Sequence, residues 1–403
     1  MTNEQNPADD PWKGCNPMDP GFRDDPYPSL KRLREREPVN LTPVGIWRLM
    51  RHADVQKLLT DVKCGVRTTE GRLYGADDEL SDGIFMLRQD PPNHSRLRKL
   101  VSHAFTPKAL NAWQQEIQRV VDECLDRVAD AGEMDVIKDL ALPVPSTIIC
   151  EMLGVRVEDR DRFTQWTSQA TFGLAKAILP KEVGDMADAA GQQLNNYFEQ
   201  LIAERRANPR EDLLSLMIKA EEEGDKLSFD ELMAQSVGLL IAGFETTIGL
   251  IGNGVRALLK NPKELEKLRK NPELRQKAIQ ECLRYDGPIV LTSRVLHEDA
   301  EFSGTMIPRN SMVWGMLASA NRDPEAFPDP DRLHIERDAT DHVAFGGGPH
   351  FCLGYRLAEL EAQAAIATLA QRFKDIELKS NVVEWGASLF RVPGRLPISF
   401  RNN

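Results

Sequence analysis

The stretch 345–354 reads F-G-G-G-P-H-F-C-L-G and places one thiol, Cys352, in a glycine-rich loop. An apolar stretch with helical character, 353–369, follows at once. Glycines let the backbone turn tightly and come close to a flat ligand, and free amides at a helix N-terminus help a thiolate to keep its charge. The pattern predicts a single sulfur ligand for a metal that something other than the protein holds. A glycine-rich loop taken alone would favour a turn with a buried structural cysteine.

Four other segments favour the metal-binding interpretation. They read D-P-P-N-H-S-R-L-R at 90–98, A-G-F-E-T-T at 242–247, E-C-L-R at 281–284 and A-N-R-D-P at 320–324. Together with the cysteine loop they follow the order of the motifs of cytochrome P450, and the chain resembles this family over nearly its whole length. Five matches in order over about 260 residues leave little room for chance agreement.

The composition of the 403 residues is that of a globular protein, with 41% hydrophobic and 28% charged residues. The most apolar stretch, 237–255, contains Glu245 and Asn253, so no membrane span is predicted. The N-terminal stretch M-T-N-E-Q-N-P-A-D-D-P lacks the pattern of a signal peptide or membrane anchor. The six cysteines form no C-x-x-C pair, and the net charge of −11 argues against nucleic acid as a partner. We therefore expect a cytoplasmic protein that binds neither nucleic acid nor a membrane.

Helical periodicity dominates most of the chain. Thr106 is a good N-cap for a helix with Pro107 at its first position. Ser228 and Glu231 form a capping box, and the helix that it opens could continue to Lys260. That helix would contain about 32 residues and be roughly 48 Å long. Because its middle is apolar on all sides, we expect it to run buried through the centre of the protein.

The other segments predict a smaller amount of β structure. Residues 39–50 favour a hairpin, and residues 295–314 and the C-terminal residues favour short strands. The acidic stretch 221–226 is typical of a solvated loop, and residues 1–25 are typical of an irregular arm. We predict a mainly α fold with a small β part, organised as one domain over residues 26–403.

The resemblance implies the cytochrome P450 fold, in which the long central helix lies over haem b (iron protoporphyrin IX), with Cys352 as the ligand of the iron. A thiolate ligand favours cleavage of the O–O bond. Zinc fits poorly, because it requires about four ligands and this loop offers only His350 and Cys352. The resemblance assigns haem contacts to three further loop residues, to two residues of the central helix and to four residues at propionate-binding positions. These are Phe345, Gly346 and Gly354, then Ala242 and Gly243, then His94, Arg98, Arg294 and His350.

Glu245 and Thr246 lie in the middle of the apolar central helix, where polar groups are costly to bury. One interpretation is a threonine bonded to the carbonyl four residues back and a glutamate neutralised by a partner. The resemblance implies proton delivery instead, with Thr246 holding water and Glu245 relaying protons from outside. Gly243 would leave room beside them and allow the helix to widen locally.

Glu281 and Arg284 lie three residues apart on a helix predicted to begin at Pro272 and to end near Pro288. An exposed pair at this spacing would contribute only about 0.2–0.5 kcal/mol. The resemblance implies a buried triad with Arg332, which fixes the cysteine loop and has a structural role.

Candidate pocket residues also follow from the resemblance, and most of them are apolar: Leu73, Ile84, Phe85, Phe172, Leu239, Ala242, Ile289, Val290, Leu291, Leu389 and Phe390. They favour a medium or large apolar substrate of terpenoid, steroid, fatty acid or macrolide type. Arg67, Arg72 and Arg391 could bind a substrate carboxylate, although loop charges of this kind more often face water.

The chain has no flavin or iron–sulfur motif, so electrons must come from a ferredoxin or flavodoxin with its NAD(P)H reductase. Arg96, Lys99 and Arg356 are expected to give a positive patch on the cysteine side that steers an acidic donor. We expect a monooxygenase that hydroxylates its substrate with O2 and two electrons. Two alternatives stay open: a peroxide-using or rearranging enzyme on the same fold, and a non-catalytic haem-binding or gas-sensing protein. The Glu245–Thr246 pair argues against the peroxide-using enzyme.

Overall fold

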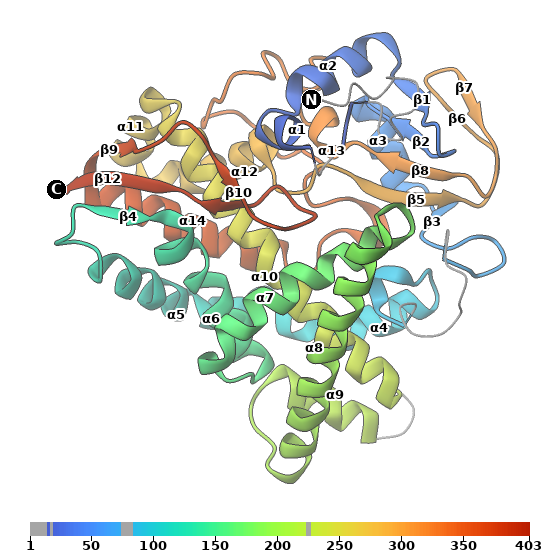
Figure 1. Ribbon diagram of the computed structural model, residues 1–403, viewed down its shortest axis with the longest axis horizontal. Coiled ribbons are helices and arrows are strands. Elements are labelled where there is room, and N and C mark those ends of the chain that lie inside the picture. Colours follow the sequence, from blue (N-terminus) through green and yellow to red (C-terminus); the bar gives the residue numbers. More distant parts are fainter. Residues whose placement is uncertain (1–13, 17–18, 74–83, 223–226) are drawn as a thin grey trace.

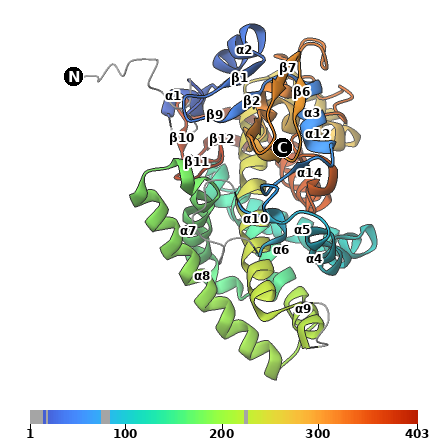
Figure 2. The ribbon, with the colours of Figure 1, turned by 90° about the vertical axis from the view of Figure 1, so that its right-hand side faces the viewer.

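The helix opened by the capping box is α10 (Phe229–Leu259), and it forms the axis of the fold. The Ser228 hydroxyl accepts a hydrogen bond of 3.1 Å from the Glu231 amide, and the Glu231 carboxylate accepts one of 2.9 Å from the Ser228 amide. Figure 2 shows α10 running vertically through the molecule, with α7 and α8 on one side and α5 and α14 on the other. Most of its residues are buried, so the prediction of a buried central helix is confirmed.

The computed structural model describes residues 14–16, 19–73, 84–222 and 227–403 (Figure 1). Within these residues the helices are α1 (Pro20–Asp24), α2 (Tyr27–Arg36), α3 (His52–Thr60), α4 (Asn93–Ser102), α5 (Pro107–Asp126), α6 (Pro143–Leu153), α7 (Arg160–Ala170), α8 (Lys181–Ala207), α9 (Leu213–Glu222), α10, α11 (Pro262–Lys270), α12 (Arg275–Asp286), α13 (Leu317–Ala320) and α14 (Tyr355–Arg372). Two 3₁₀ turns matter for the site, η5 (Thr171–Ile178) and η7 (Gly348–His350).

The strands of the described residues are β1 (Val39–Leu41), β2 (Trp47–Leu49), β3 (Cys64–Gly65), β4 (Glu133–Asp135), β5 (Thr292–Leu296), β6 (Ala300–Phe302), β7 (Thr305–Ile307), β8 (Met312–Gly315), β9 (Phe373–Leu378), β10 (Glu384–Trp385), β11 (Pro393–Arg395) and β12 (Pro397–Asn402). The largest sheet has the order β1-β2-β8-β5-β3. The predicted hairpin is its antiparallel β1–β2 edge, in which Val39 pairs with Leu49 and Leu41 with Trp47. The mainly α fold with a small β part is confirmed.

The main hydrophobic core lies around α10 and includes residues of α5, α6, α8, α12 and α14. A second cluster packs beneath the five-stranded sheet, and a third joins the N-terminal helices to the segment 312–318. Thr106 caps α5 as predicted, because its hydroxyl accepts a 3.3 Å hydrogen bond from the Ala109 amide. Among the described residues, α10 alone is long and apolar enough to cross a membrane, and 61% of its most apolar window is buried inside the protein.

Two predictions about irregular segments need correction. Residues Pro20–Asp24 form α1, because Asp19 caps the Phe22 amide at 2.8 Å and Pro20 begins the helix. Glu221 and Glu222 end α9 instead of belonging to a loop. Residues 1–13, 17–18 and 223–226, on which other parts of these two predictions fall, lie outside the described residues.

Candidate active site

The cysteine loop, residues 345–354, contains η7 and leads into α14, and two of its glycines adopt positive φ angles of 73° (Gly346) and 61° (Gly348). A Cβ atom at Gly348 would lie 2.3 Å from the carbonyl oxygen of Leu59 in α3, so only glycine fits there. The Cys352 amide donates a 2.9 Å hydrogen bond to the Phe345 carbonyl and closes the loop. The sequence therefore folds here into a tight turn that presents the sulfur at the start of α14.

The surroundings of the Cys352 thiol favour binding of a metal cation. Burial raises its pKa to about 11, while a hydrogen bond from the Gly354 amide and the charge of Arg98 oppose the increase. A metal ion removes the proton from a thiol that coordinates it. The amide of Gly354 and the guanidinium of Arg98 would then stabilise the resulting negative charge.

Four nitrogen-bearing side chains gather beside this loop. His94 and Arg98 come from α4, Arg294 from β5 and His350 from η7. The rings of His94 and His350 lie 4.2 Å apart between centroids, and Arg98 donates a 3.3 Å hydrogen bond to the Pro349 carbonyl. Arg294 is only 5% exposed, and burial lowers its pKa to about 10. The structure thus brings together all four residues that the resemblance assigned to the propionates.

The two histidines of this cluster are neutral near pH 7. Burial, and then the neighbouring His350 and Arg98, lower the pKa of His94 to about 4, and burial lowers that of His350. Each can still donate one ring N–H to an acceptor. The nearest carboxylate, Asp90, lies 3.9 Å from the Nε2 atom of His350, which is too far for a hydrogen bond.

The cluster fits the two carboxylates of haem. Within the described part of the chain, neither Arg98 nor Arg294 forms an ion pair, and the Nδ1 atom of His94 and both ring nitrogens of His350 are buried without a hydrogen-bond partner. Buried donors and cations without partners are costly. Two propionates would supply acceptors and charge to this cluster, next to the one thiol of the glycine-rich loop.

One face of α10 is accessible at the middle of the helix. Ala242 is exposed and Gly243 and Thr246 are partly exposed, although most of their neighbours in the helix are buried. The Thr246 hydroxyl donates a 2.8 Å hydrogen bond to the Ala242 carbonyl, which is the local bond that the sequence allowed as an alternative. The hydroxyl keeps its acceptor lone pairs for water or substrate.

Glu245 points away from this face and is 3% exposed. Its Oε1 atom accepts a 2.9 Å hydrogen bond from Ser168 of α7, and its Oε2 atom has no partner among the described residues. Burial raises the pKa of Glu245, and the nearby hydroxyls of Ser388, Ser168 and Thr171 oppose the increase. This carboxyl can therefore gain and lose a proton closer to neutral pH than an ordinary glutamate.

Phe85 is the candidate pocket residue whose placement is best defined. A Cβ atom at Gly238 of α10 would lie 2.4 Å from its ring, so Phe85 packs directly on the central helix. Gln235 holds the segment, because its amide donates to the Ile84 carbonyl at 3.1 Å and accepts from the Met86 amide at 3.2 Å. The sequence did not indicate this role for Gln235.

The other pocket candidates lie in several settings. Phe172 of η5 and Leu239 of α10 are buried, while Leu389 and Phe390 are partly buried. Leu73 is bridged to Arg67, next to residues outside the described part. Ile289, Val290 and Leu291 pack against the second and third hydrophobic clusters, and Val290 is only 8% exposed within the third. The side chain of Val290 thus also contributes to packing in the third cluster.

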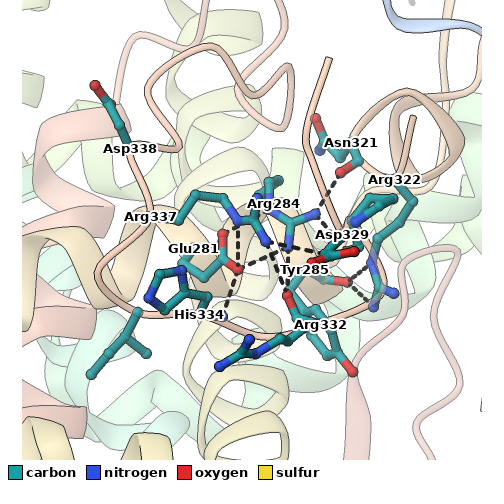
Figure 3. A network of polar contacts seen from close by, with 12 residues as sticks. Glu281, Arg284, Tyr285, Asn321, Arg322, Asp329, Arg332, His334, Arg337 and Asp338 are labelled. Carbon is teal, nitrogen blue, oxygen red and sulfur yellow. Dashed lines mark hydrogen bonds and ion pairs between the residues drawn. The ribbon is translucent and has the colours of Figure 1, made fainter. Parts of the chain in front are cut away.

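The buried triad exists, but its third member is wrong in the sequence-based prediction. Glu281 and Arg284 are both fully buried and joined by two hydrogen bonds of 2.7 and 2.8 Å. The second guanidinium belongs to Arg337, whose Nε atom donates to Glu281 at 3.2 Å (Figure 3). Arg332 has an exposed side chain and contributes only its carbonyl oxygen, which accepts from Arg284 at 3.3 Å.

Two other arginines are also engaged elsewhere. Arg391 is 3% exposed and binds Asp286 and the Arg23 carbonyl, so it is not free to bind a substrate carboxylate. Arg96 forms an ion pair with Glu231, which offsets its charge in the expected positive patch. Each contact joins residues more than 100 positions apart in the chain, and local sequence patterns carry no signal for it.

Comparisons with known proteins identify the family of this chain. The family model "Cytochrome P450" matches residues 41–382. Cytochrome P450 107B1 of Saccharopolyspora erythraea is 40% identical over 401 residues, covering 94% of this chain and 96% of the relative. The vitamin D(3) 25-hydroxylase of Pseudonocardia autotrophica is 38% identical over 388 residues, covering 94% of both. The crystal structure of P450BioI with an acyl carrier protein ligated to hexadec-9Z-enoic acid superposes with a TM-score of 0.87 at 34% identity, covering 95% of this chain and 99% of that one. This chain therefore belongs to the cytochrome P450 family, whose cofactor is haem b ligated by a cysteine thiolate.

Proposed function

We propose that this monooxygenase hydroxylates an apolar small molecule of terpenoid, steroid, fatty acid or macrolide type in the cytoplasm, with electrons from a separate ferredoxin or flavodoxin and its NAD(P)H reductase. When bound, haem supplies the binding of dioxygen and the cleavage of its O–O bond. The observation that supports this proposal most strongly is that the thiol of Cys352 lies beside a cluster of buried hydrogen-bond donors without partners. In addition, the ring of Phe85 packs on Gly238 of α10 and forms part of an apolar wall, to which Leu239 and Phe172 also belong. The residues of the chain hold the cofactor, orient the substrate and move protons.

Each group of residues has a separate task in this proposal. Cys352 holds the iron, and the loop residues Phe345, Gly346 and Gly354 shape its surroundings. Arg98 and Arg294 neutralise the propionates, and His94 and His350 donate hydrogen bonds to them. Thr246 orders water at the open face of α10.

Glu245 moves protons to the water at Thr246. Its buried carboxyl already has a hydroxyl donor in Ser168, and its second oxygen is free among the described residues. Because burial raises the pKa of this carboxyl, it binds a proton more readily than an ordinary glutamate and can pass it on and be protonated again. Because Glu245 and Thr246 are neighbours on a helix, about 100° apart around its axis, a water molecule is needed to join them.

The apolar wall supports an apolar substrate. Phe85, Leu239 and Phe172 offer rings or aliphatic groups. Two of the similar proteins are named for apolar compounds: one is a vitamin D(3) 25-hydroxylase, and the other, P450BioI, was crystallised with a fatty acid ligated to an acyl carrier protein. For the electron donor, Lys99 and Arg356 stay exposed on the side of the cysteine loop, while Arg96 is offset by Glu231. An acidic iron–sulfur protein or flavoprotein suits the two exposed cations.

The test begins with a panel of terpenoids, steroids, fatty acids and macrolides, screened for changes in the haem absorption spectrum. Compounds that bind are then incubated with a surrogate ferredoxin, its reductase and isotopically labelled dioxygen. We expect one labelled oxygen atom in the product. Turnover with hydrogen peroxide but none with the electron donors would support the peroxide-using alternative, and no turnover with any bound compound would support a non-catalytic haem protein.

Phe85→Ala tests the apolar wall, with Leu87→Ala as the matched control. Leu87 is two residues away and 44% exposed, so its side chain does not face α10 as Phe85 does. Phe85→Ala should change substrate affinity or the position of hydroxylation, and Leu87→Ala should change neither. Equal behaviour of the two variants would remove Phe85 from the pocket.

A further inference from the structure

The surroundings of Glu245 include one cation from a part of the chain that is far away in sequence. The carboxyl faces Ser168 of α7, Thr171 of η5, Ser388 of the C-terminal loop and, from α1, the positive charge of Arg23. The three hydroxyls carry no charge. Arg23 is therefore the charged group that acts on this carboxyl, although the two side chains are 222 positions apart in the chain.

Arg23 has an unusual position for an arginine in a short N-terminal helix. It is 7% exposed, its Nη2 atom donates a 2.9 Å hydrogen bond to the Phe390 carbonyl, and its Nε atom is buried without a partner among the described residues. Two charged groups act on its guanidinium: Arg391 repels it, and Glu245 attracts it. No carboxylate of the described residues forms an ion pair with it, so its burial is not explained by a surface contact.

A single short segment connects the two groups. Arg23 binds the carbonyl of Phe390, the Phe390 amide donates to the Ser388 hydroxyl at 3.0 Å, and Ser388 lies beside the Glu245 carboxyl. The charge of Arg23 therefore acts on Glu245 across the three residues 388–390, of which Ser388 is buried and Leu389 and Phe390 are partly buried, so that water screens it only in part.

The position of α1 is itself fixed by a buried network. Arg391 donates a 2.8 Å hydrogen bond to the Arg23 carbonyl and is held by Asp286. Asp286 accepts a 2.7 Å hydrogen bond from the Tyr27 hydroxyl and lies 3.6 Å from Arg256 of α10. α1 is thus attached to the central helix and to the C-terminal loop, so that the charge of Arg23 stays in place.

We propose that Arg23 is a positioning residue for proton delivery, which sets the charge state of Glu245 from α1 through the segment 388–390. The inference rests on the proposed role of Glu245 as a proton relay and adds the group that controls it. A positive charge near a carboxyl favours its ionised form and opposes the effect of burial. With Arg23 in place, Glu245 can give up its proton; without it, the carboxyl would hold the proton too firmly to pass it on.

The experiment measures the protonation of Glu245 directly, without turnover. Infrared spectra of the holoenzyme are recorded against pH, and the carbonyl band of the protonated carboxyl is assigned by its loss in Glu245→Gln. We expect Arg23→Gln to move the titration of this band to higher pH by about one unit, at the low end of the effect of a nearby opposite charge. Arg23→Lys keeps the positive charge and should titrate close to the parent. Arg32→Gln, which removes an exposed arginine of α2, should cause no shift.

A second measurement, of unfolding stability against pH, remains informative if Arg23→Gln is less stable than the parent. With Glu245 present, the difference in unfolding free energy between Arg23→Lys and Arg23→Gln should depend on pH. When both variants also carry Glu245→Gln, this pH dependence should disappear. An unshifted carbonyl band, or a pH dependence that persists without Glu245, would overturn the inference.

The ratio of product to hydrogen peroxide separates the two proposals. If the band shifts and the ratio falls in Arg23→Gln, both the inference and the proton relay are supported. If the band shifts but neither Arg23→Gln nor Glu245→Gln alters the ratio, the coupling stands as a charge interaction, the relay assigned to Glu245 fails, and with it the positioning role of Arg23.

Discussion

Arg337→Gln is expected to destabilise the protein much more than Arg332→Gln, although the two arginines are only five residues apart. Arg337 donates to the fully buried Glu281 and to the carbonyls of Pro328 at 2.6 Å and Asp329 at 3.1 Å. The side chain of Arg332 is exposed and takes no part in the network, since its contribution is a backbone carbonyl that glutamine also has.

The expected magnitude follows from the bonds that are lost. A hydrogen bond to a charged group contributes about 1.5–3 kcal/mol, and a buried group left without its partner adds to the loss. Glu281 would keep Arg284 and the His334 amide at 2.8 Å, so the carboxylate would not be left alone. We therefore expect a loss of about 2–4 kcal/mol in the free energy of unfolding for Arg337→Gln. For Arg332→Gln we expect a change within about 0.5 kcal/mol.

The assay is urea unfolding followed by far-ultraviolet circular dichroism, with the ratio of haem to protein measured on the same preparations. Arg337→Gln should unfold at lower urea concentration and bind less haem, because the network in Figure 3 supports the segment that leads into the cysteine loop. Equal stability of the two variants would refute the assignment. Greater damage from Arg332→Gln would restore the triad predicted from the sequence.

Three further predictions concern the rest of the site. Arg98→Leu and Arg294→Leu should each weaken haem binding by about 2–5 kcal/mol through loss of a propionate partner, measured as haem transfer to apomyoglobin; unchanged transfer rates would exclude this role. Thr246→Ala should keep haem and substrate binding while the product per reduced cofactor falls and hydrogen peroxide rises, whereas Thr246→Ser should stay coupled; full coupling in Thr246→Ala would contradict the role of the hydroxyl. Glu361→Gln should remove a pH dependence of stability, because burial raises the pKa of Glu361 well above its usual value and only the Thr247 hydroxyl opposes this. The folded chain then keeps a proton that the unfolded chain releases, so the parent should lose up to about 1.4 kcal/mol per pH unit as pH rises above about 5, and equal slopes for parent and variant in urea unfolding would refute it.

Local signals in the sequence were sufficient for the elements that carry the site. The capping box of Ser228 and Glu231 predicted the start of α10, and the glycine spacing around Cys352 predicted the tight loop that positive φ angles require. These features depend on residues close together in the chain. The helix α1 was missed because five residues are too few to form a helix by themselves, and contacts with Arg391 hold it in place.

Errors arose where residues distant in sequence meet. Arg332 and Arg337 carry the same side chain on one irregular segment, and only the path of that segment decides which guanidinium reaches Glu281. The sequence allows Arg391 to bind a substrate carboxylate, but in the structure it binds Asp286 and the Arg23 carbonyl of α1. Composition and spacing contain no information about either packing arrangement.

The most direct test of the account is the spectrum of the reduced carbon monoxide complex of the parent chain and of Cys352→His. We predict that the parent shows the long-wavelength Soret band of thiolate-ligated haem that gives the family its name. The variant should bind haem without that band, because imidazole would replace the thiolate. The same band in Cys352→His, or its absence from haem-loaded parent protein, would contradict the assignment of Cys352 as the ligand of the iron.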